Sequence, residues 1–146
     1  MYKALTAQLE SLSEGVTYPV TILANAAAIL FNSLDDINWA GFYKLDDGML
    51  LLGPFQGKPA CMKIPVGKGV CGTSVVRREP ILVENVHEFP GHIACDSASN
   101  SEIVIPIRKH NSIIGVLDID SPTIGRFHDS DMQGLEEFVA VLEKYL

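Results

Sequence analysis

Residues 102–120 read EIVIPIRKHNSIIGVLDID, two β-rich runs joined by a turn at 110–111. An earlier pair has the same form, because INWAGFYKL (37–45) and MLLLGPF (49–55) flank the turn DDG (46–48). Asp-Gly between two such runs is a strong hairpin signal. The two pairs therefore predict the main strands of an antiparallel sheet.

Helices are predicted at both ends of the chain. Leucines at helical spacing predict a first helix over residues 5–12, and Pro19 begins an alanine-rich second helix that continues to Leu30. Near the C-terminus, apolar residues recur at helical spacing over residues 132–142, behind a capping Asp129. Strands joined by hairpins with helices at both ends indicate an α+β fold, an antiparallel sheet flanked by helices.

Between the two hairpins the pattern is less regular. Three glycines within residues 67–72 precede a short helix expected to end near Arg78, and Pro80 begins a strand, ILVENV (81–86). The following stretch up to residue 100 is rich in His, Pro, Gly, Asp and Ser. It is too polar for a strand and longer than most connections, which predicts a functional loop.

The composition describes one folded, acidic domain spanning residues 1–146, of which 47% are apolar and 20% charged. A net charge of −7 disfavours binding to nucleic-acid phosphates. The longest apolar stretch, 22–31, falls well short of the ~20 residues that a membrane span needs. The N-terminal residues lack the pattern of a secretory signal. We therefore expect a cytoplasmic protein that binds a small molecule or another protein.

Carboxylates gather on one face of the predicted sheet. The two-residue period of a strand places Asp118 and Asp120 on the same face, ~6.5–7 Å apart, with Glu102 at the start of the neighbouring run as a third candidate. One interpretation is a sheet edge that faces water. The other is the wall of a pocket that binds a cation.

The same period groups aromatic residues in the first hairpin. Trp39, Gly41 and Tyr43 share a face, and the missing side chain of Gly41 leaves a gap in which a small ligand could lie between the rings. The competing interpretation is that both rings fill the core.

Three cysteines, Cys61, Cys71 and Cys95, lie at spacings unlike those of structural zinc sites. No metal is therefore expected, although His87 and His92 near Cys95 leave a metal site open. Cys61 and Cys71 have apolar neighbours and fit small buried side chains. Cys95 lies in the polar segment GHIACDSASNS, where an exposed thiol would be oxidised unless it is used, and His92 could favour its thiolate. Cys71, near a predicted helix start, could also have a lowered pKa. Spacing alone leaves the nucleophile open.

Taken together, these segments resemble the free methionine-R-sulfoxide reductases, which are stand-alone GAF domains. The similarity runs from INWAGFYKL through GPFQGKPAC, IPVGKGVCGTSV, GHIACDSASNSEIVIPI and GVLDIDSP to the final helix. It implies a GAF fold, a central antiparallel sheet with helices on its two faces. Many members of the family are homodimers.

The resemblance also implies roles for individual residues. Cys95 would be the nucleophile, Cys61 the main resolving thiol and Cys71 an auxiliary or alternative partner. The substrate pocket would comprise Trp39, Tyr43, Glu102, Asp118 and Asp120. Thioredoxin would reduce the resulting disulfide, and no cofactor would be needed because thiols supply the electrons.

Such a reaction needs an acid beside the nucleophile, because a sulfoxide sulfur is a poor electrophile until its oxygen is protonated or hydrogen-bonded. Repulsion and burial should raise the pKa of at least one clustered carboxyl, and we expect that group to bind the sulfoxide oxygen. The remaining negative charge suits the substrate's ammonium group. Trp39 would then contact the S-methyl group.

Two other functions compete with this one. A GAF module that senses a small molecule such as a cyclic nucleotide would bind its ligand without turnover. A thiol redox switch would form a disulfide between Cys61 and Cys95 with peroxide as readily as with a sulfoxide.

Overall fold

The computed structural model describes residues 1–93, 95 and 97–146. Its centre is an antiparallel sheet with the strand order β3-β2-β1-β6-β5-β4. The strands are β1 (Trp39–Asp46), β2 (Met49–Gly57), β3 (Lys63–Pro65), β4 (Ile81–Val83), β5 (Ser101–Lys109) and β6 (Ser112–Ser121).

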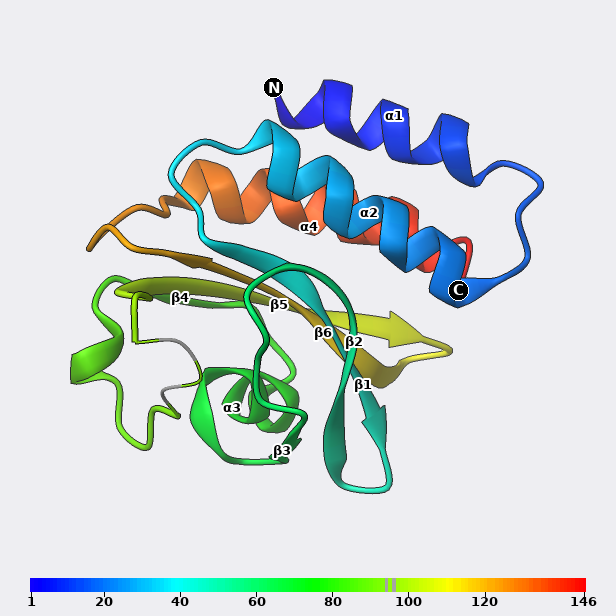
Figure 1. Cartoon of the computed structure of the whole chain (residues 1–146). Helices are drawn as coiled ribbons and strands as arrows, with labels where there is room; N and C mark the ends of the chain where they lie inside the picture. The colour runs from blue at the N-terminus through cyan, green and yellow to red at the C-terminus, as the bar shows by residue number, and fades with distance from the viewer. Residues whose placement is uncertain (94, 96) are drawn as a thin grey trace.

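Helices cover both faces of this sheet (Figure 1). The elements are α1 (Tyr2–Ser13), α2 (Pro19–Ser33), α3 (Gly69–Arg77), α4 (Asp129–Glu143) and the 3-10 turn η1 (Val86–Glu88). In Figure 1 α1, α2 and α4 lie together on one side, which we call the helical face. The other side, the loop face, carries α3 and the segment that contains η1. The expected α+β class and GAF-like arrangement are confirmed.

The alternation of side chains along the strands builds a separate apolar core on each face. Ile103 and Ile105 of β5 point to the helical face, where they pack with Leu117 of β6 and with residues of α1, α2 and α4. Val104 and Val116 point the other way and pack against α3. Because both faces are covered, β5 is almost entirely buried, which explains its near-continuous apolar sequence.

The two predicted hairpins form as expected. Asp47 and Gly48 adopt positive φ angles of 47° and 79° between β1 and β2, and His110 and Asn111 adopt 51° and 65° between β5 and β6. Two consecutive residues with positive φ match the right-handed twist of paired strands, and Asp, Asn and Gly tolerate that conformation best.

The strand predicted over residues 81–86 is shorter than expected, since β4 ends at Val83. The Asn85 side chain accepts a hydrogen bond from the backbone N–H of His87 and thereby caps η1. This local alternative to strand pairing ends the sheet there. Within the described chain, no helix combines the length and apolar character that crossing a bilayer would require.

Candidate active site

The register of the central strands brings three carboxyl groups together on the loop face. β6 lies between β1 and β5, and Asp120 pairs with Glu102 on one side and Trp39 on the other. Asp118, two residues earlier, lies on the same face, and Glu102 and Asp118 are only 8% and 6% exposed. The interpretation of Asp118 as part of a solvated sheet edge is therefore wrong.

The aromatic residues of β1 lie beside this cluster, but the gap predicted at Gly41 does not exist. A Cβ at Gly41 would stand 2.3 Å from Phe55 Cβ and 2.8 Å from the Trp39 ring. The Trp39 ring stacks on Phe55 at a centroid distance of 5.2 Å and on Tyr43 at 6.0 Å. Gly41 thus makes room for the protein's own rings, and both rings are buried in the core, as the competing interpretation held.

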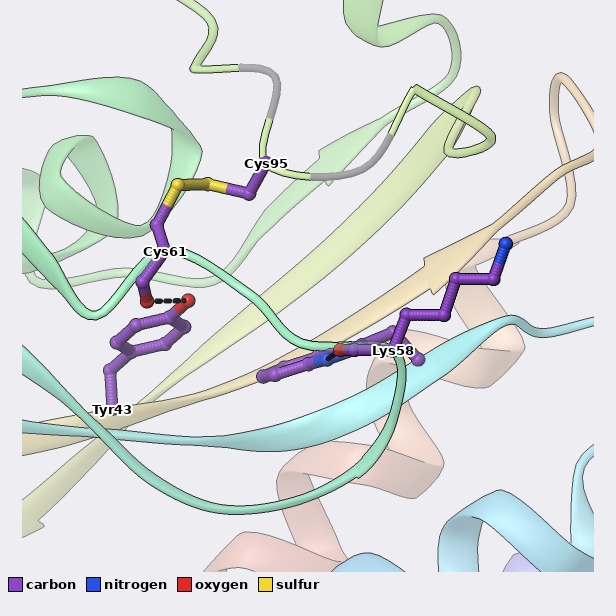
Figure 2. The surroundings of a disulfide bond; sticks show 5 residues. Tyr43, Lys58, Cys61 and Cys95 are labelled. Carbon is purple, nitrogen blue, oxygen red and sulfur yellow. Dashed lines mark hydrogen bonds between the residues drawn. A yellow bond between two sulfur atoms is a disulfide. The ribbon is translucent and has the colours of Figure 1, made fainter.

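The polar atoms of these two rings hold the segment that carries Cys61. The Trp39 indole Nε1–H donates to the Lys58 carbonyl at 3.1 Å, and the Tyr43 hydroxyl donates to the Cys61 carbonyl at 2.9 Å. Figure 2 shows the Tyr43 ring beneath Cys61 with this hydrogen bond. Strand β1 therefore positions the connection between β2 and β3 over the loop face.

A disulfide joins Cys61 to Cys95, across 34 residues of sequence, with a Cα–Cα distance of 5.4 Å. It ties the connection between β2 and β3 to the loop that precedes β5 (Figure 2). This is the pair that the family resemblance implied. The base of the same loop is held by the Asn38 side chain, whose Nδ2 donates to Ser99 Oγ at 3.1 Å.

Beneath the disulfide lies a cavity of about 40 Å³. Seven of the eight predicted site residues line it: Trp39, Tyr43, Cys71, Cys95, Glu102, Asp118 and Asp120. The eighth, Cys61, is bonded to Cys95 at its edge. A cavity of this size holds about three water molecules. The disulfide form thus has a small pocket with a carboxyl floor.

The structure adds His92, Ile93 and Ser99 to the residues around this cavity. The polar segment 91–101 carried the signal for a functional loop, but a single sequence does not indicate which of its side chains turn inward. Ile93 packs against Gly69 at the start of α3, where an added Cβ would meet the Ile93 side chain at 3.4 Å. This contact brings the loop close to Cys71.

The carboxyl groups of the cavity differ in how their surroundings shift their pKa values. Burial and the charges of Asp118 and Asp120 raise the pKa of Glu102 well above its usual value. Burial also raises the pKa of Asp118, but hydrogen bonds from Glu102, Cys71 and Asp120 oppose that rise. Of these two groups, Glu102 is therefore the better candidate for a protonated acid.

Cys71 does not have the lowered pKa suggested by its place near a helix start. The residue is 3% exposed, and burial together with the neighbouring Asp118 raises the pKa of its thiol well above the usual value. The favourable field of a short helix is smaller than the cost of an anion in a buried, acidic cavity. His92 has a lowered pKa, through partial burial first and His87 second.

Comparisons with known proteins agree with this fold and site. The GAF domain model matches residues 10–146. The chain is 58% identical over 145 residues to the free methionine-R-sulfoxide reductase of Escherichia coli (strain K12), covering 99% of this chain and 88% of that protein.

Solved structures give the same result. The reduced form of the Staphylococcus aureus protein called fRMsr matches with a TM-score of 0.96 and 54% identity, covering 99% of this chain and 94% of that one. Its complex with substrate matches with a TM-score of 0.95 and 53% identity, covering 99% and 95%. A buried carboxyl cluster, a cysteine pair above it and these full-length similarities lead to one conclusion: the chain belongs to the free methionine-R-sulfoxide reductase family of GAF-domain proteins.

Proposed function

We propose that this protein reduces free L-methionine-R-sulfoxide to L-methionine through thiol chemistry. The observation that carries the proposal is the Cys61–Cys95 disulfide above a cavity floored by Glu102, Asp118 and Asp120. A redox-active cysteine pair and a protonated acid in one pocket are the two chemical needs of sulfoxide reduction. The reductase names of the relatives support the same reaction.

In the first step the Cys95 thiolate attacks the sulfoxide sulfur. Glu102 is the group best suited to donate a hydrogen bond, and then its proton, to the sulfoxide oxygen, because its pKa is raised and it is buried beside two other carboxyls. The oxygen leaves on Cys95 as a sulfenic acid, and methionine is released. The stereochemical preference comes from the family alone.

The carboxyl groups of the cavity floor would also explain why the substrate is a free amino acid and not a residue in a polypeptide. Asp118 and Asp120 supply negative charge for the ammonium group, and no Lys or Arg is among the described residues that line the cavity. A methionine sulfoxide inside a polypeptide has no such ammonium group. We assign the contact with the S-methyl group to Trp39, which also lines the cavity.

In the second step Cys61 attacks the Cys95 sulfenic acid, a disulfide forms and water leaves. The Cα–Cα distance of 5.4 Å in the disulfide lies within the usual range for bonded cysteines. Cys71 remains the auxiliary or alternative thiol. No cofactor enters the scheme, because two thiols supply both electrons.

We further propose that thioredoxin reduces the disulfide and that the cycle runs in the cytoplasm, where dithiol reductants are maintained. A homodimer, as in many members of the family, completes the proposal.

The direct test follows the loss of free L-methionine-R-sulfoxide, with the S epimer and a peptide-bound sulfoxide in parallel, using thioredoxin with its recycling system. We expect turnover of the free R epimer alone. Cys95→Ser should abolish turnover and leave the circular dichroism spectrum unchanged. Substantial activity in Cys95→Ser would refute Cys95 as the nucleophile.

The same assay separates the competing functions. A purely sensory GAF module would bind a small molecule, such as a cyclic nucleotide, and turn over no sulfoxide. A redox switch would form the Cys61–Cys95 disulfide equally fast with hydrogen peroxide and with methionine sulfoxide. We expect disulfide formation to be much faster with the sulfoxide.

A further inference from the structure

Cys71 has no part in the Cys61–Cys95 disulfide, yet it lies deep in the cavity. Its Sγ, a carboxyl oxygen of Glu102 and a carboxyl oxygen of Asp118 all lie within 4.8 Å of one another. The three side chains come from α3, β5 and β6, and each is buried. The cluster arises only through tertiary structure, because the three residues are far apart in the sequence.

One atom of this cluster is unsatisfied. Asp118 Oδ1 is buried and has no hydrogen-bond partner among the described residues. Asp118 is also one of the residues that line the cavity. A buried acceptor without a donor is costly and points to an ion or molecule that completes the site.

We propose that Cys71, Glu102 and Asp118 form a binding site for a thiophilic divalent cation, of which Zn²⁺ is the prototype. One thiolate and two carboxylates are ligands that Zn²⁺ accepts, and the cavity leaves room for a water molecule as the fourth ligand. Mg²⁺ and Ca²⁺ do not suit this site, because both ions prefer oxygen ligands alone and higher coordination numbers.

The geometry is close to what Zn²⁺ needs. Tetrahedral zinc holds its sulfur and oxygen donors roughly 3.3–3.8 Å apart. The donors here lie within 4.8 Å, so small side-chain rotations close the site. On binding, the Cys71 thiol and the Glu102 carboxyl release their protons to solvent, and the two positive charges offset the buried anions.

The consequence for activity rests on the proposed function, whereas the binding does not. The cation would occupy the carboxyls assigned to the sulfoxide oxygen and the ammonium group. Zn²⁺ should therefore act as an inhibitor that competes with free methionine sulfoxide.

The disulfide form of the protein offers a clean test, because the chain has three cysteines and two are then bonded to each other. Cys71 is the single remaining thiol. We would titrate oxidised protein with Co²⁺ and follow the near-ultraviolet thiolate-to-cobalt absorption band. We expect a band that saturates at one equivalent and disappears when Zn²⁺, but not Mg²⁺, is added.

Variants assign the ligands. Cys71→Ser should remove the band, and Asp118→Asn should weaken Co²⁺ binding at least tenfold. Glu88→Gln, which neutralises an exposed carboxylate away from the cavity, serves as the matched control and should bind like the wild type. Circular dichroism and Trp39 fluorescence verify the fold of each variant. If Cys71→Ser does not fold, the band of the wild type and the weaker Co²⁺ binding of Asp118→Asn decide the question.

The absence of a thiolate band in oxidised wild-type protein would overturn the site. So would a band that Asp118→Asn leaves unchanged. Failure of the proposed function is distinguishable from both: a protein that binds Co²⁺ through Cys71 but turns over no sulfoxide keeps the metal site and loses the activity.

Discussion

Glu102 shows how neighbouring residues can raise the pKa of a carboxyl group and so suit it to act as an acid. Its pKa is raised well above the usual value by burial and by two adjacent carboxyls, whereas the rise that burial causes in the pKa of Asp118 is opposed by hydrogen bonds. The three residues are of the same chemical class, and only their surroundings distinguish them. The sequence predicted the cluster but left the identity of the proton donor open.

Replacing Glu102 by Gln tests this assignment through catalysis. Gln can hydrogen-bond to the sulfoxide oxygen but cannot give up a proton, so we expect kcat to fall about 10²–10³-fold. In the wild type, turnover should decline as the pH rises through the raised pKa of Glu102. Steady-state rates between pH 5 and 10 check both points, and an unchanged alkaline decline in the variant would assign it to another group.

Glu102→Gln should increase the free energy of unfolding, although it lowers kcat. Because Glu102 has a raised pKa in the folded state, the folded protein binds its proton more tightly than the unfolded chain does. The free energy of unfolding then falls as the pH rises from the usual Glu pKa to the raised one. Glu102→Gln removes this loss, so urea denaturation at several pH values should show a variant with a flatter pH dependence and greater stability near neutral pH.

Gly41 is required by packing alone. An Ala side chain there would meet Phe55 Cβ at 2.3 Å, so we expect Gly41→Ala to cost about 1–3 kcal/mol of unfolding free energy. It should also change the emission of Trp39, the chain's one tryptophan. Gly48→Ala is the control: Gly48 has a φ of 79° and nothing within 4 Å, so its cost is conformational and about 1 kcal/mol, without a change in emission.

At the scale of elements, strand β1 is both part of the sheet and a support for the segment that carries Cys61. The Tyr43 hydroxyl holds the Cys61 carbonyl, and the Trp39 indole holds the Lys58 carbonyl. The family resemblance implied substrate contact for these aromatic residues. Their observed polar contacts are with the segment that carries Cys61.

Tyr43→Phe should therefore slow disulfide formation more than methionine release. In a single turnover without reductant, we expect release of methionine at a near wild-type rate and formation of the disulfide several-fold more slowly, with sulfenic acid accumulating. Quenched-flow sampling with a sulfenic-acid probe would measure both. Equal slowing of both steps would instead place the Tyr43 hydroxyl in the sulfoxide step.

Tyr2→Phe is a matched control for the loss of a partly buried tyrosine hydroxyl. Tyr2 donates to Asp131 Oδ1 at 2.6 Å and ties α1 to the start of α4, on the face away from the cavity. Its removal should lower stability by about 1 kcal/mol and leave the ratio of the two rates unchanged.

At the scale of the whole molecule, the disulfide and the pocket are two states of one site. The cavity of about 40 Å³ in the disulfide form is too small for a free amino acid, although 99% of the chain matches the reduced relative with a TM-score of 0.96. Binding should therefore depend on the loop that carries Cys95, with the frame unchanged.

Calorimetry can test this dependence. We expect methionine sulfoxide to bind Cys95→Ser, which cannot form the disulfide, at least tenfold more tightly than it binds oxidised wild-type protein. Cys95→Ser stands for the reduced form here, because the reduced wild type would turn the sulfoxide over. Equal affinity for both redox forms would show that the disulfide does not close the pocket.

Much of the architecture was predictable from local patterns. The Asp-Gly turn, the leucine spacing and the Asp129 segment are signals within about a dozen residues, and the hairpins and terminal helices formed as predicted. The alternation in GVLDID also placed Asp118 and Asp120 on one face. The end of β4 at Val83 was missed because Asn85 competes for the backbone with its own side chain.

The sequence by itself determined the α+β class, the strand pairs, the shared face of the carboxyls and, through family resemblance, the cysteine pair. Only the tertiary structure decided between the alternatives. It placed β6 in the middle of the sheet, Phe55 in the space beside Gly41, and Cys71 next to Asp118 in a buried cavity. Side-chain periodicity is local and can be read from neighbours in the chain. Burial, and with it every pKa in this site, depends on which distant segments pack together.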